Sequence, residues 1–421
     1  MRRIAIVGAG QAGLQLGFGL LKAGYEVVLY SDMTSEQIFN GPARPVTIQF
    51  GKSVSFEDEL DIRFWKENRY SQIQCAYFSV FSSAGEKLMD INGEFEKAAQ
   101  CMDLRMKFGK WLEVFEERGG RVVIEKCDTD SLERMAAEND LVLVASGRGQ
   151  FMEMFEKDES KMEFDRPQRQ VAMFYTKGCN MHRQLEDVSG LKDKQLSRYS
   201  VIAGVGEVIK APFLSKSGEE HHYVQFEAVP GAGMDMFDNK ADVAEQYALA
   251  KEWVREHQPL IYELIEDSTT TPEKEWVCGR IPPTVRKPVG TLPSGKMVFG
   301  VGDAAIVTDP ILAQGQNAAS KWMGLLLNQI IARGVEPFSA DWMQKSFDEY
   351  WETAQYNLKF TATGLRGPGP VQQKLMLAAS QNKAIAHRFI NSLGEAHKLH
   401  PWYWDEKEAD KVLAEYGVNV A

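Results

Sequence analysis

Short apolar runs alternate with helical spacing at the start of the chain. RRIAIV (residues 2–7) and EVVLY (residues 26–30) are apolar runs of strand length, and QAGLQLGFGLLKAG (residues 11–24) between them repeats apolar positions at the spacing of a helix. Gly24 is a plausible end for that helix, because glycine readily adopts the left-handed conformation found at helix C-termini. The order strand, helix, strand predicts a parallel βαβ unit.

Three later apolar runs continue this pattern. RVVIE (residues 121–125), NDLVLVASG (residues 139–147) and KMVFGVGDA (residues 296–304) have the continuous apolar character of strands in a parallel sheet. Helical segments at residues 106–120 and 315–334 each end in glycine. These pieces predict an α/β fold built on a parallel sheet.

Segments with a different residue pattern separate these strands and helices in the sequence. Residues 74–91 and 205–229 have the aromatic, alternating character of antiparallel strands. From Asp341 onward the pattern is helical, with a Gly/Pro-rich break, GLRGPGP, in the middle. We therefore expect domains that are discontinuous in sequence. The predicted division is a nucleotide-binding domain of residues 1–45, 100–150 and 290–335, a β-rich substrate-binding domain of residues 46–99 and 151–289, and a helical C-terminal region of residues 336–421.

Composition narrows the classes of function. The chain has 421 residues, of which 44% are hydrophobic and 25% charged, as expected of a globular protein with two or more domains. Its net charge of -11 argues against nucleic-acid and anionic membrane partners, and no apolar stretch is long enough to cross a bilayer. Five scattered cysteines indicate free thiols in a cytoplasmic protein, and the histidines show no metal-type spacing. We expect no metal site, and the sequence leaves a homodimer open.

A glycine motif connects the first strand to the first helix. Gly8, Gly10 and Gly13 form GxGxxG. The first glycine permits a tight turn, the second lets the backbone approach a pyrophosphate, and the third lets helix and strand pack closely. Gln11 and Ala12 begin the helix, whose N–H groups and partial positive charge favour phosphates. With the flanking strands present, the motif predicts dinucleotide binding rather than a merely structural turn.

The residue expected to bind the ribose is displaced. Such folds place Glu or Asp at the end of the second strand, where this chain has Ser31, and Asp32 follows one residue later. Because successive strand residues point to opposite faces, Asp32 can substitute only if the strand has already ended. Either Asp32 curls back to the ribose, or a charge-assisted hydrogen bond worth roughly 1.5–3 kcal/mol is lost.

A second glycine turn follows the last apolar run. With both turns present, the chain resembles the FAD-dependent monooxygenases of the para-hydroxybenzoate hydroxylase fold, in which one FAD reaches both. This resemblance implies a Rossmann-type FAD-binding domain (GR2-like) with an inserted antiparallel-sheet substrate domain and a helical C-terminal region. The matching residues of the second turn are Gly302, Asp303, Pro310, Gly315, Gln316 and Asn317.

The resemblance also implies roles for these residues. Asp303 would hydrogen-bond the ribityl chain, and Pro310 would lie beside the isoalloxazine ring. The N–H groups of Gly315, Gln316 and Asn317, at the start of the long helix, would face the flavin N1/O2 edge. A helix N-terminus there stabilises the negative charge of reduced flavin.

Two arginines extend the implied cofactor site. Arg105 stands where the family has an arginine at the start of a helix near the flavin. Arg44 lies in the loop that often reaches the pyrophosphate. For each, a surface salt bridge is the alternative interpretation.

One departure from single-component hydroxylases concerns the reductant. Those enzymes carry an Asp-Gly motif that serves FAD and a nicotinamide, whereas LVLVASGRGQF has Ser146-Gly147 and no acid. We therefore expect that NAD(P)H does not reduce the flavin here. The chain is more closely similar, over nearly its full length, to the oxygenase component of styrene and indole monooxygenases. The matching segments are VGAGQAGLQLG, PVTIQ, FEKDESKMEFDRPQR, GVGEVIKAP, HQPLIYELI and GDAAIVTDPILAQGQNAAS, of which RPQR and DPILAQGQN are the specific ones.

This similarity implies a two-component enzyme. Reduced FAD would arrive as a diffusible co-substrate from a separate NADH:flavin reductase and react with O2 to a C4a-hydroperoxide that epoxidises a small apolar aromatic alkene. The protein would orient the flavin and exclude water, with no side chain acting as acid or base. QCAYFSVF (residues 74–81) departs from the styrene enzymes, in which histidine and tyrosines cluster, so indole or another aromatic alkene is as plausible as styrene.

Aromatic residues on the predicted strands are candidates for an apolar substrate pocket. For each of them, an ordinary core position is the alternative. The candidates are Tyr77, Phe78, Phe213, Tyr223 and Phe226, with Phe360 from the late helical region as a further one.

Four other functions are compatible with this fold, one of which is a reductase of prenyl chains that would consume no O2. A single-component NAD(P)H-dependent aromatic hydroxylase would bleach its FAD with NAD(P)H alone. A flavin-dependent halogenase would carry WxWxIP, whereas PWYW at residues 401–404 lacks Ile-Pro. A non-catalytic flavin- or protein-binding member would have no reason to keep both glycine turns, and FAD titration would distinguish it.

Overall fold

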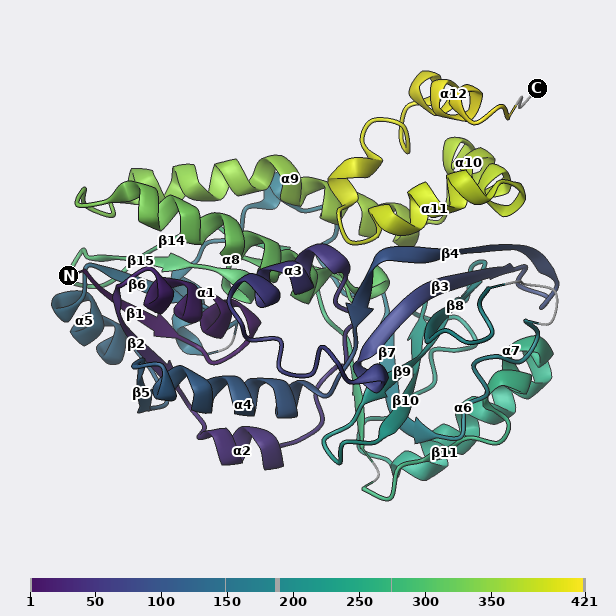
Figure 1. Cartoon of the computed structure of the whole chain (residues 1–421), viewed down its shortest axis with the longest axis horizontal. Coiled ribbons are helices and arrows are strands. Elements are labelled where there is room, and N and C mark those ends of the chain that lie inside the picture. Colours follow the sequence, from purple (N-terminus) through teal and green to yellow (C-terminus); the bar gives the residue numbers. More distant parts are fainter. Residues whose placement is uncertain (1, 148, 186–189, 274, 419–421) are drawn as a thin grey trace.

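Two large β-sheets with surrounding helices make up the computed structural model, which describes residues 2–147, 149–185, 190–273 and 275–418 (Figure 1). The strands are β1 (Arg3–Val7), β2 (Glu26–Ser31), β3 (Gln72–Phe81), β4 (Lys87–Gln100), β5 (Arg121–Ile124), β6 (Leu141–Val144), β7 (Gln170–Lys177), β8 (Leu196–Ile202), β9 (Gly206–Leu214), β10 (Glu220–Ala228), β11 (Thr269–Thr270), β12 (Trp276–Gly279), β13 (Thr284–Val285), β14 (Val289–Thr291), β15 (Met297–Gly300) and β16 (Ile306–Val307). The α-helices are α1 (Gln11–Lys22), α2 (Ser35–Asn40), α3 (Gly51–Glu59), α4 (Leu104–Glu117), α5 (Thr129–Glu138), α6 (Val243–His257), α7 (Pro259–Ile265), α8 (Gln314–Arg333), α9 (Ala340–Arg366), α10 (Pro370–Gln381), α11 (Lys383–Ser392) and α12 (Glu406–Glu415).

The first sheet has six strands in the order β14-β15-β6-β1-β2-β5, and only β14 pairs antiparallel. Both of its faces are covered, which explains its continuous apolar runs. Ile4 and Ile6 of β1 pack in the core that includes α1, α4 and α8. Ala5 and Val7 pack on the opposite face in the core that includes α5.

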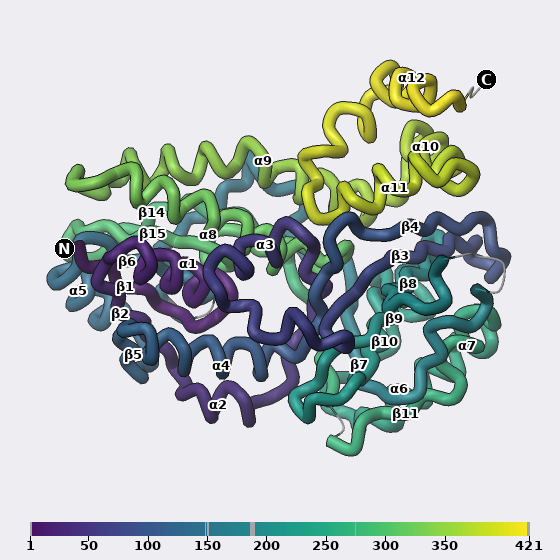
Figure 2. The backbone as a smooth tube through the Cα atoms, in the orientation of Figure 1, coloured from purple at the N-terminus to yellow at the C-terminus, as the bar shows by residue number. Residues whose placement is uncertain are grey.

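Distant parts of the chain meet in this sheet. β15, from the last third of the chain, pairs in parallel with β6, and β6 pairs in parallel with β1 (Figure 2). Val144, near the carboxyl end of β6, is in register with both Val7 and Gly300. The turns that follow β1, β6 and β15 therefore leave from the same edge.

The second sheet has eight strands, in the order β11-β7-β10-β9-β8-β3-β4 with β12 also paired to β7. Its pairs are antiparallel except for β3 with β8. One face packs against α6 and α7, and the other packs against α10 and α11, with α12 packed on α10 (Figure 1). Strand alternation thus gives this sheet two separate apolar cores.

The predicted fold class is confirmed: a parallel Rossmann-like sheet, an antiparallel sheet and a helical C-terminal region are interleaved in one chain. The division into domains with the boundaries given above stays a prediction. All five cysteines are free thiols. Within the described part of the chain, no helix combines the length and apolarity needed to cross a membrane.

Gly13→Ala should destabilise the protein, because a Cβ at this position would lie 1.9 Å from the Gly8 carbonyl oxygen. Overpacking of this kind costs about 1–3 kcal/mol or more. Gly10→Ala is the matched control: no atom lies within 4 Å of the position that its Cβ would take, and the loss should stay below about 1 kcal/mol. Urea unfolding of both variants measures the difference, and equal losses would contradict this account of the turn.

Candidate functional site

Close backbone contacts shape the turn at residues 8–13, here called the front turn. Gly8 has a φ of +118°, and a Cβ there would lie 3.1 Å from backbone atoms of Ala145 and Ser146. A Cβ on Gly13 would overlap the carbonyl oxygen of Gly8. A Cβ on Gly10, in contrast, would meet no atom within 4 Å. The second glycine of the motif therefore leaves room for a ligand at the N-terminus of α1, as pyrophosphate binding requires.

The back turn, residues 302–317, packs directly on the front turn. Gly302 has a φ of +57°, and a Cβ there would lie 2.9 Å from the Cβ of Ala12. A Cβ on Gly147 would lie 2.6 Å from the Cβ of Asp303. The three turns that follow β1, β6 and β15 therefore contact one another. The carboxyl edge of a parallel sheet is where open α/β folds bind their ligands.

Hydrogen bonds join the helices that begin at these two turns. Gln316 Nε2 donates to Gln11 Oε1 at 2.9 Å, and Gln15 Nε2 donates to the carbonyl oxygen of Ser320 at 2.9 Å. Gly315 lies in the same first turn of α8 as Gln316. The N-cap residues of α1 and α8 provide no side-chain cap. Two helix N-termini, each with a partial positive charge, are thus held close to each other.

The residues expected at the ribose lie at the end of β2. β2 ends at Ser31, whose hydroxyl donates to the carbonyl oxygen of Met33 at 2.6 Å. Asp32 follows the strand and is exposed. Because the strand has ended before Asp32, strand alternation does not fix the direction of its side chain, which is the condition under which Asp32 could turn toward a ribose. Its contact with a ribose stays a prediction.

The back turn is strained. Leu312 and Ala313 have φ values of 63° and 55°, in the left-handed region that non-glycine residues rarely adopt. Asp309 helps to hold this conformation, because its Oδ1 accepts a hydrogen bond from the N–H of Ile311 at 3.1 Å. Pro310 lies half-buried between them. Such strain persists only where the surroundings enforce it, and it is concentrated at functional sites.

Asn317 ties the back turn to the segment PVTIQF. Its Nδ2 donates to the carbonyl oxygens of Ile48 and Ala313 at 2.9 and 2.7 Å, and its Oδ1 accepts from the N–H of Phe50 at 2.9 Å. The buried side chain is therefore committed to protein contacts. Any contact with a flavin in this part of α8 would therefore be made by backbone atoms.

The two candidate arginines have different surroundings. Arg105 is fully buried and forms ion pairs with Asp103 and Glu275, so it is not a surface salt bridge. The guanidinium carbon of Arg44 lies 6.0 Å from the centre of the Phe108 ring. Neither contact involves the glycine turns, and the roles of both arginines toward FAD stay predictions.

A buried polar network beneath the front turn was not predicted. Lys107 Nζ donates to Glu57 Oε1 at 2.6 Å and to Gln49 Oε1, and Glu57 also accepts from Gln11 Nε2 at 3.2 Å. Lys107 and Glu57 are 1% and 0% exposed, and burial lowers the pKa of Lys107. The available signal was a lysine among the apolar positions of the helix predicted at residues 106–120.

The structure divides the aromatic candidates between the two faces of the eight-stranded sheet. The face toward α10 and α11 carries Phe78, Phe213 and Tyr223, and Phe360 of α9 belongs to the same apolar core. The face toward α6 and α7 carries Tyr77 and Phe226. Leu312 and Ala313 of the back turn pack against the first group. An apolar pocket that includes the back turn would therefore draw on Phe78, Phe213, Tyr223 and Phe360.

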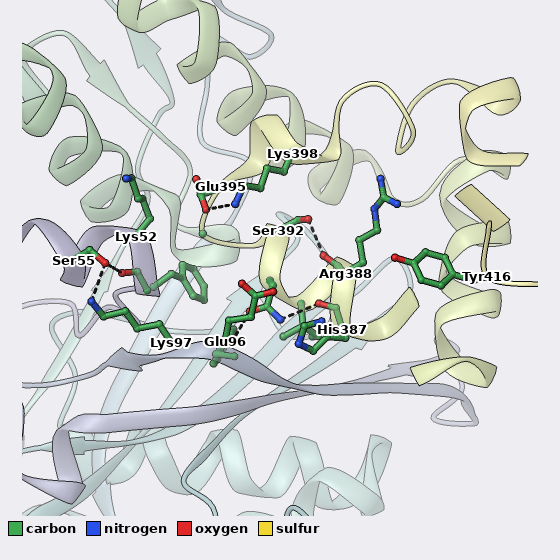
Figure 3. Close-up of a pocket in the computed structure, with 16 residues that line it drawn as sticks. Lys52, Ser55, Glu96, Lys97, His387, Arg388, Ser392, Glu395, Lys398 and Tyr416 are labelled. Carbon is green, nitrogen blue, oxygen red and sulfur yellow. Dashed lines mark hydrogen bonds and ion pairs between the residues drawn. The ribbon is translucent and has the colours of Figure 1, made fainter. Parts of the chain in front are cut away.

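A separate groove of about 670 Å³ lies between α3, β4 and α11 (Figure 3). Three of its cations form ion pairs: Lys97 with Asp58, Arg388 with Glu415, and Lys398 with Glu395. The groove contains none of the residues predicted at the glycine turns.

Comparison with known proteins agrees with this geometry. Residues 147–263 match the family model "Styrene monooxygenase A putative substrate binding domain". Styrene monooxygenase StyA of Pseudomonas fluorescens is 26% identical over 99% of this chain and 97% of its own. A flavin-dependent brominase structure superposes with a TM-score of 0.65 and 14% identity, covering 99% of each chain. That of 2-methyl-3-hydroxypyridine-5-carboxylic acid oxygenase has a TM-score of 0.57 and 15% identity, covering 94% of this chain and 96% of that one.

The interleaved sheets and the converging turns define the fold of the FAD-dependent monooxygenases. Over nearly its full length, the chain is similar to the styrene monooxygenases StyA, and the match to the family model lies within that similarity.

Lys107→Met should destabilise the protein by about 3–5 kcal/mol, because it leaves the carboxylate of Glu57 buried without its cation. The double variant Lys107→Met/Glu57→Gln should recover most of that loss, since the amide removes the buried charge. Chemical unfolding of both variants tests the pair. A single variant as stable as the wild type would show that the ion pair is not required.

Proposed function

We propose that this protein is the oxygenase component of a two-component monooxygenase. It takes reduced FAD from a separate NADH:flavin reductase and uses O2 to epoxidise a small aromatic alkene of the styrene or indole type. The observation that carries the proposal is the convergence of the front and back turns at the N-termini of α1 and α8.

The residues at these turns fit FAD. Gly10 has no neighbour where a side chain would project, and a pyrophosphate can approach the backbone there. Gly302 packs against Ala12, so a ligand on α1 lies close to Asp303. Asp303 is exposed and lies in the short turn that follows β15, as expected of a residue that hydrogen-bonds the ribityl chain.

The turn that follows β6, residues 145–147, supports the proposal that a separate protein reduces the flavin. Ser146 and Gly147 occupy the position of the Asp-Gly motif that serves the nicotinamide in single-component enzymes. Gly147 packs so closely on Asp303 that a Cβ there would overlap it. This turn therefore supports contact with Asp303 and provides no carboxylate for a second nucleotide.

The chain's own residues would position the reactants. Bound reduced FAD supplies the electrons that activate O2 for transfer of one oxygen atom to the substrate. The N-terminus of α1 would hold the pyrophosphate, and that of α8 would stabilise the negative isoalloxazine edge. Phe78, Phe213 and Tyr223 lie on a buried sheet face, which would orient an apolar substrate and exclude water.

Substrate turnover should depend on an added NADH:flavin reductase. The experiment combines purified protein, FAD, NADH and O2 with styrene, indole or an aryl thioether, with and without the reductase, and identifies products by mass spectrometry with ¹⁸O₂. We expect one labelled oxygen atom in the product, and only when the reductase is present. Reductase, FAD and NADH without this protein control for oxidation by free reduced flavin.

Two results would contradict different parts of the proposal. Rapid bleaching of bound FAD by NAD(P)H alone would establish a single-component hydroxylase. Tight FAD binding without oxidation of any of the three substrates would overturn the substrate class and leave the cofactor assignment intact.

Gly10→Val should abolish FAD binding while leaving the protein folded, because its side chain would fill the space that the pyrophosphate needs. Gly279→Val is the matched control: this glycine also has no atom within 4 Å of its Cβ position, but it lies on β12. FAD fluorescence titration and thermal melting should show loss of binding in the first variant alone. Normal FAD affinity of Gly10→Val would remove the front turn from the site.

A further inference from the structure

A buried cluster of charged residues lies between the second sheet and the back turn. It consists of Arg169, Glu207, Glu227 and Asp309, here called the carboxyl cluster. Glu207 on β9 and Glu227 on β10 are directly opposite each other in the strand register. Arg169, just before β7, donates from Nε and Nη2 to the two carboxylate oxygens of Glu207 at 3.0 and 3.1 Å. Asp309 approaches the other three from the back turn.

The carboxyl cluster has more acids than its single cation can neutralise. Arg169, Glu207, Glu227 and Asp309 are 5%, 6%, 0% and 1% exposed. Glu227 Oε2 and Asp309 Oδ2 have no hydrogen-bond partner. Full ionisation would bury two uncompensated negative charges, which is strongly unfavourable. Two adjacent glutamates on paired strands are also mutually repulsive. The cluster is therefore stable only if it holds protons.

The electrostatics of the individual groups agree with this conclusion. Burial raises the pKa of Glu207. Burial and the adjacent Glu207 raise the pKa of Glu227 well above its usual range. Burial raises the pKa of Asp309 to about 6, so this carboxyl exchanges its proton slightly below neutral pH. The charged groups that act on Asp309 come from the start of β7, from β9 and from β10, namely Arg169, Glu207 and Glu227.

Asp309 connects the carboxyl cluster to the predicted flavin contact. It directly precedes Pro310, and its Oδ1 accepts from the N–H of Ile311 inside the strained turn. Asp309 also lines a cavity of about 20 Å³ together with Thr308, whose buried hydroxyl has no partner. One water molecule needs roughly that much room, so the cavity offers a step for proton exchange.

Metal binding does not explain the cluster, because the described residues contain no acid, histidine or cysteine group arranged to hold a metal ion. We propose that the carboxyl cluster takes up a proton when anionic reduced FAD binds, with Asp309 as the residue that couples its charge to the back turn. This inference rests on the proposed function. Asp309 is a positioning residue, because it acts through the turn and through its charge.

The direction of the effect follows from linkage. An anion bound near Asp309 raises the pKa of that carboxyl further, so the complex holds a proton that the free protein has lost. Between the two pKa values, binding of reduced FAD should therefore weaken as pH rises, by at most about tenfold per pH unit for one proton. Oxidised FAD, whose ring is neutral, should show little of this dependence.

Anaerobic calorimetry of reduced FAD binding measures the proton directly. Titrations at about pH 6.5, above the Asp309 pKa of about 6, in two buffers of different ionisation enthalpy give the number of protons taken up. We expect the wild type to take up a substantial fraction of one proton more than Asp309→Asn. The asparagine keeps an acceptor for the Ile311 N–H, and titration of the flavin itself cancels in the difference.

Asp90→Asn is the matched control, because Asp90 is a carboxylate of the same sheet that pairs with Lys87 and Ser79 outside the cluster. It should behave as the wild type. Equal proton uptake by wild type and Asp309→Asn would overturn this inference while leaving FAD binding intact. Failure of the wild type to bind either form of FAD would overturn the proposed function, and this inference with it.

A second variant covers the case in which Asp309→Asn does not fold. Glu207→Gln removes the carboxyl group whose charge raises the pKa of Asp309 and leaves Arg169 to lower it, so the pKa of Asp309 should fall. Proton uptake at about pH 6.5 should then fall. The pH above which the binding of reduced FAD weakens should shift downward. An unchanged pH profile in Glu207→Gln would contradict the coupling.

Discussion

The mutual packing of three backbone turns is the constraint on which the rest of the structure depends. The turns at residues 8–13, 145–147 and 302–303 approach so closely that a side chain at Gly13 or Gly147 would overlap its neighbours. This approach brings the N-termini of α1 and α8 to one edge of the parallel sheet. The polar networks and the aromatic face are arranged around that edge, so small changes in the turns affect both halves of the site.

Buried charges maintain the arrangement around the turns. Lys107 and Glu57 join α4 to α3, and Arg169 and Glu207 join the start of β7 to β9. Buried ion pairs add little net stability compared with well-packed apolar residues, but each partner is costly when left alone. Such pairs therefore favour one arrangement of the segments over alternatives. In this fold they act where helices and strands from distant parts of the chain meet.

One face of the antiparallel sheet is apolar along part of its length and charged at one end. Residues two apart along β9 and β10 share a face, so Phe213 and Tyr223 lie on the same side of the sheet as Glu207 and Glu227. The aromatic part of this face suits an apolar substrate, and its charged end meets the back turn. In the proposed function, proton uptake at the charged end would offset the charge of the cofactor, and the apolar part would exclude water.

Local rules were sufficient to predict the glycine turns, the parallel strands, the antiparallel hairpins and the helical C-terminal region. Steric limits on glycine and the periods of helices and strands act within a few residues, so the sequence by itself determined these features. Alternation also separates Tyr77 from Phe78, but only the topology decides which of the two faces the back turn. The contact of Gly147 with Asp303 and the carboxyl cluster depend on segments far apart in the chain. Only the tertiary structure decided them, because the partners of a buried charged residue come together only when the chain folds.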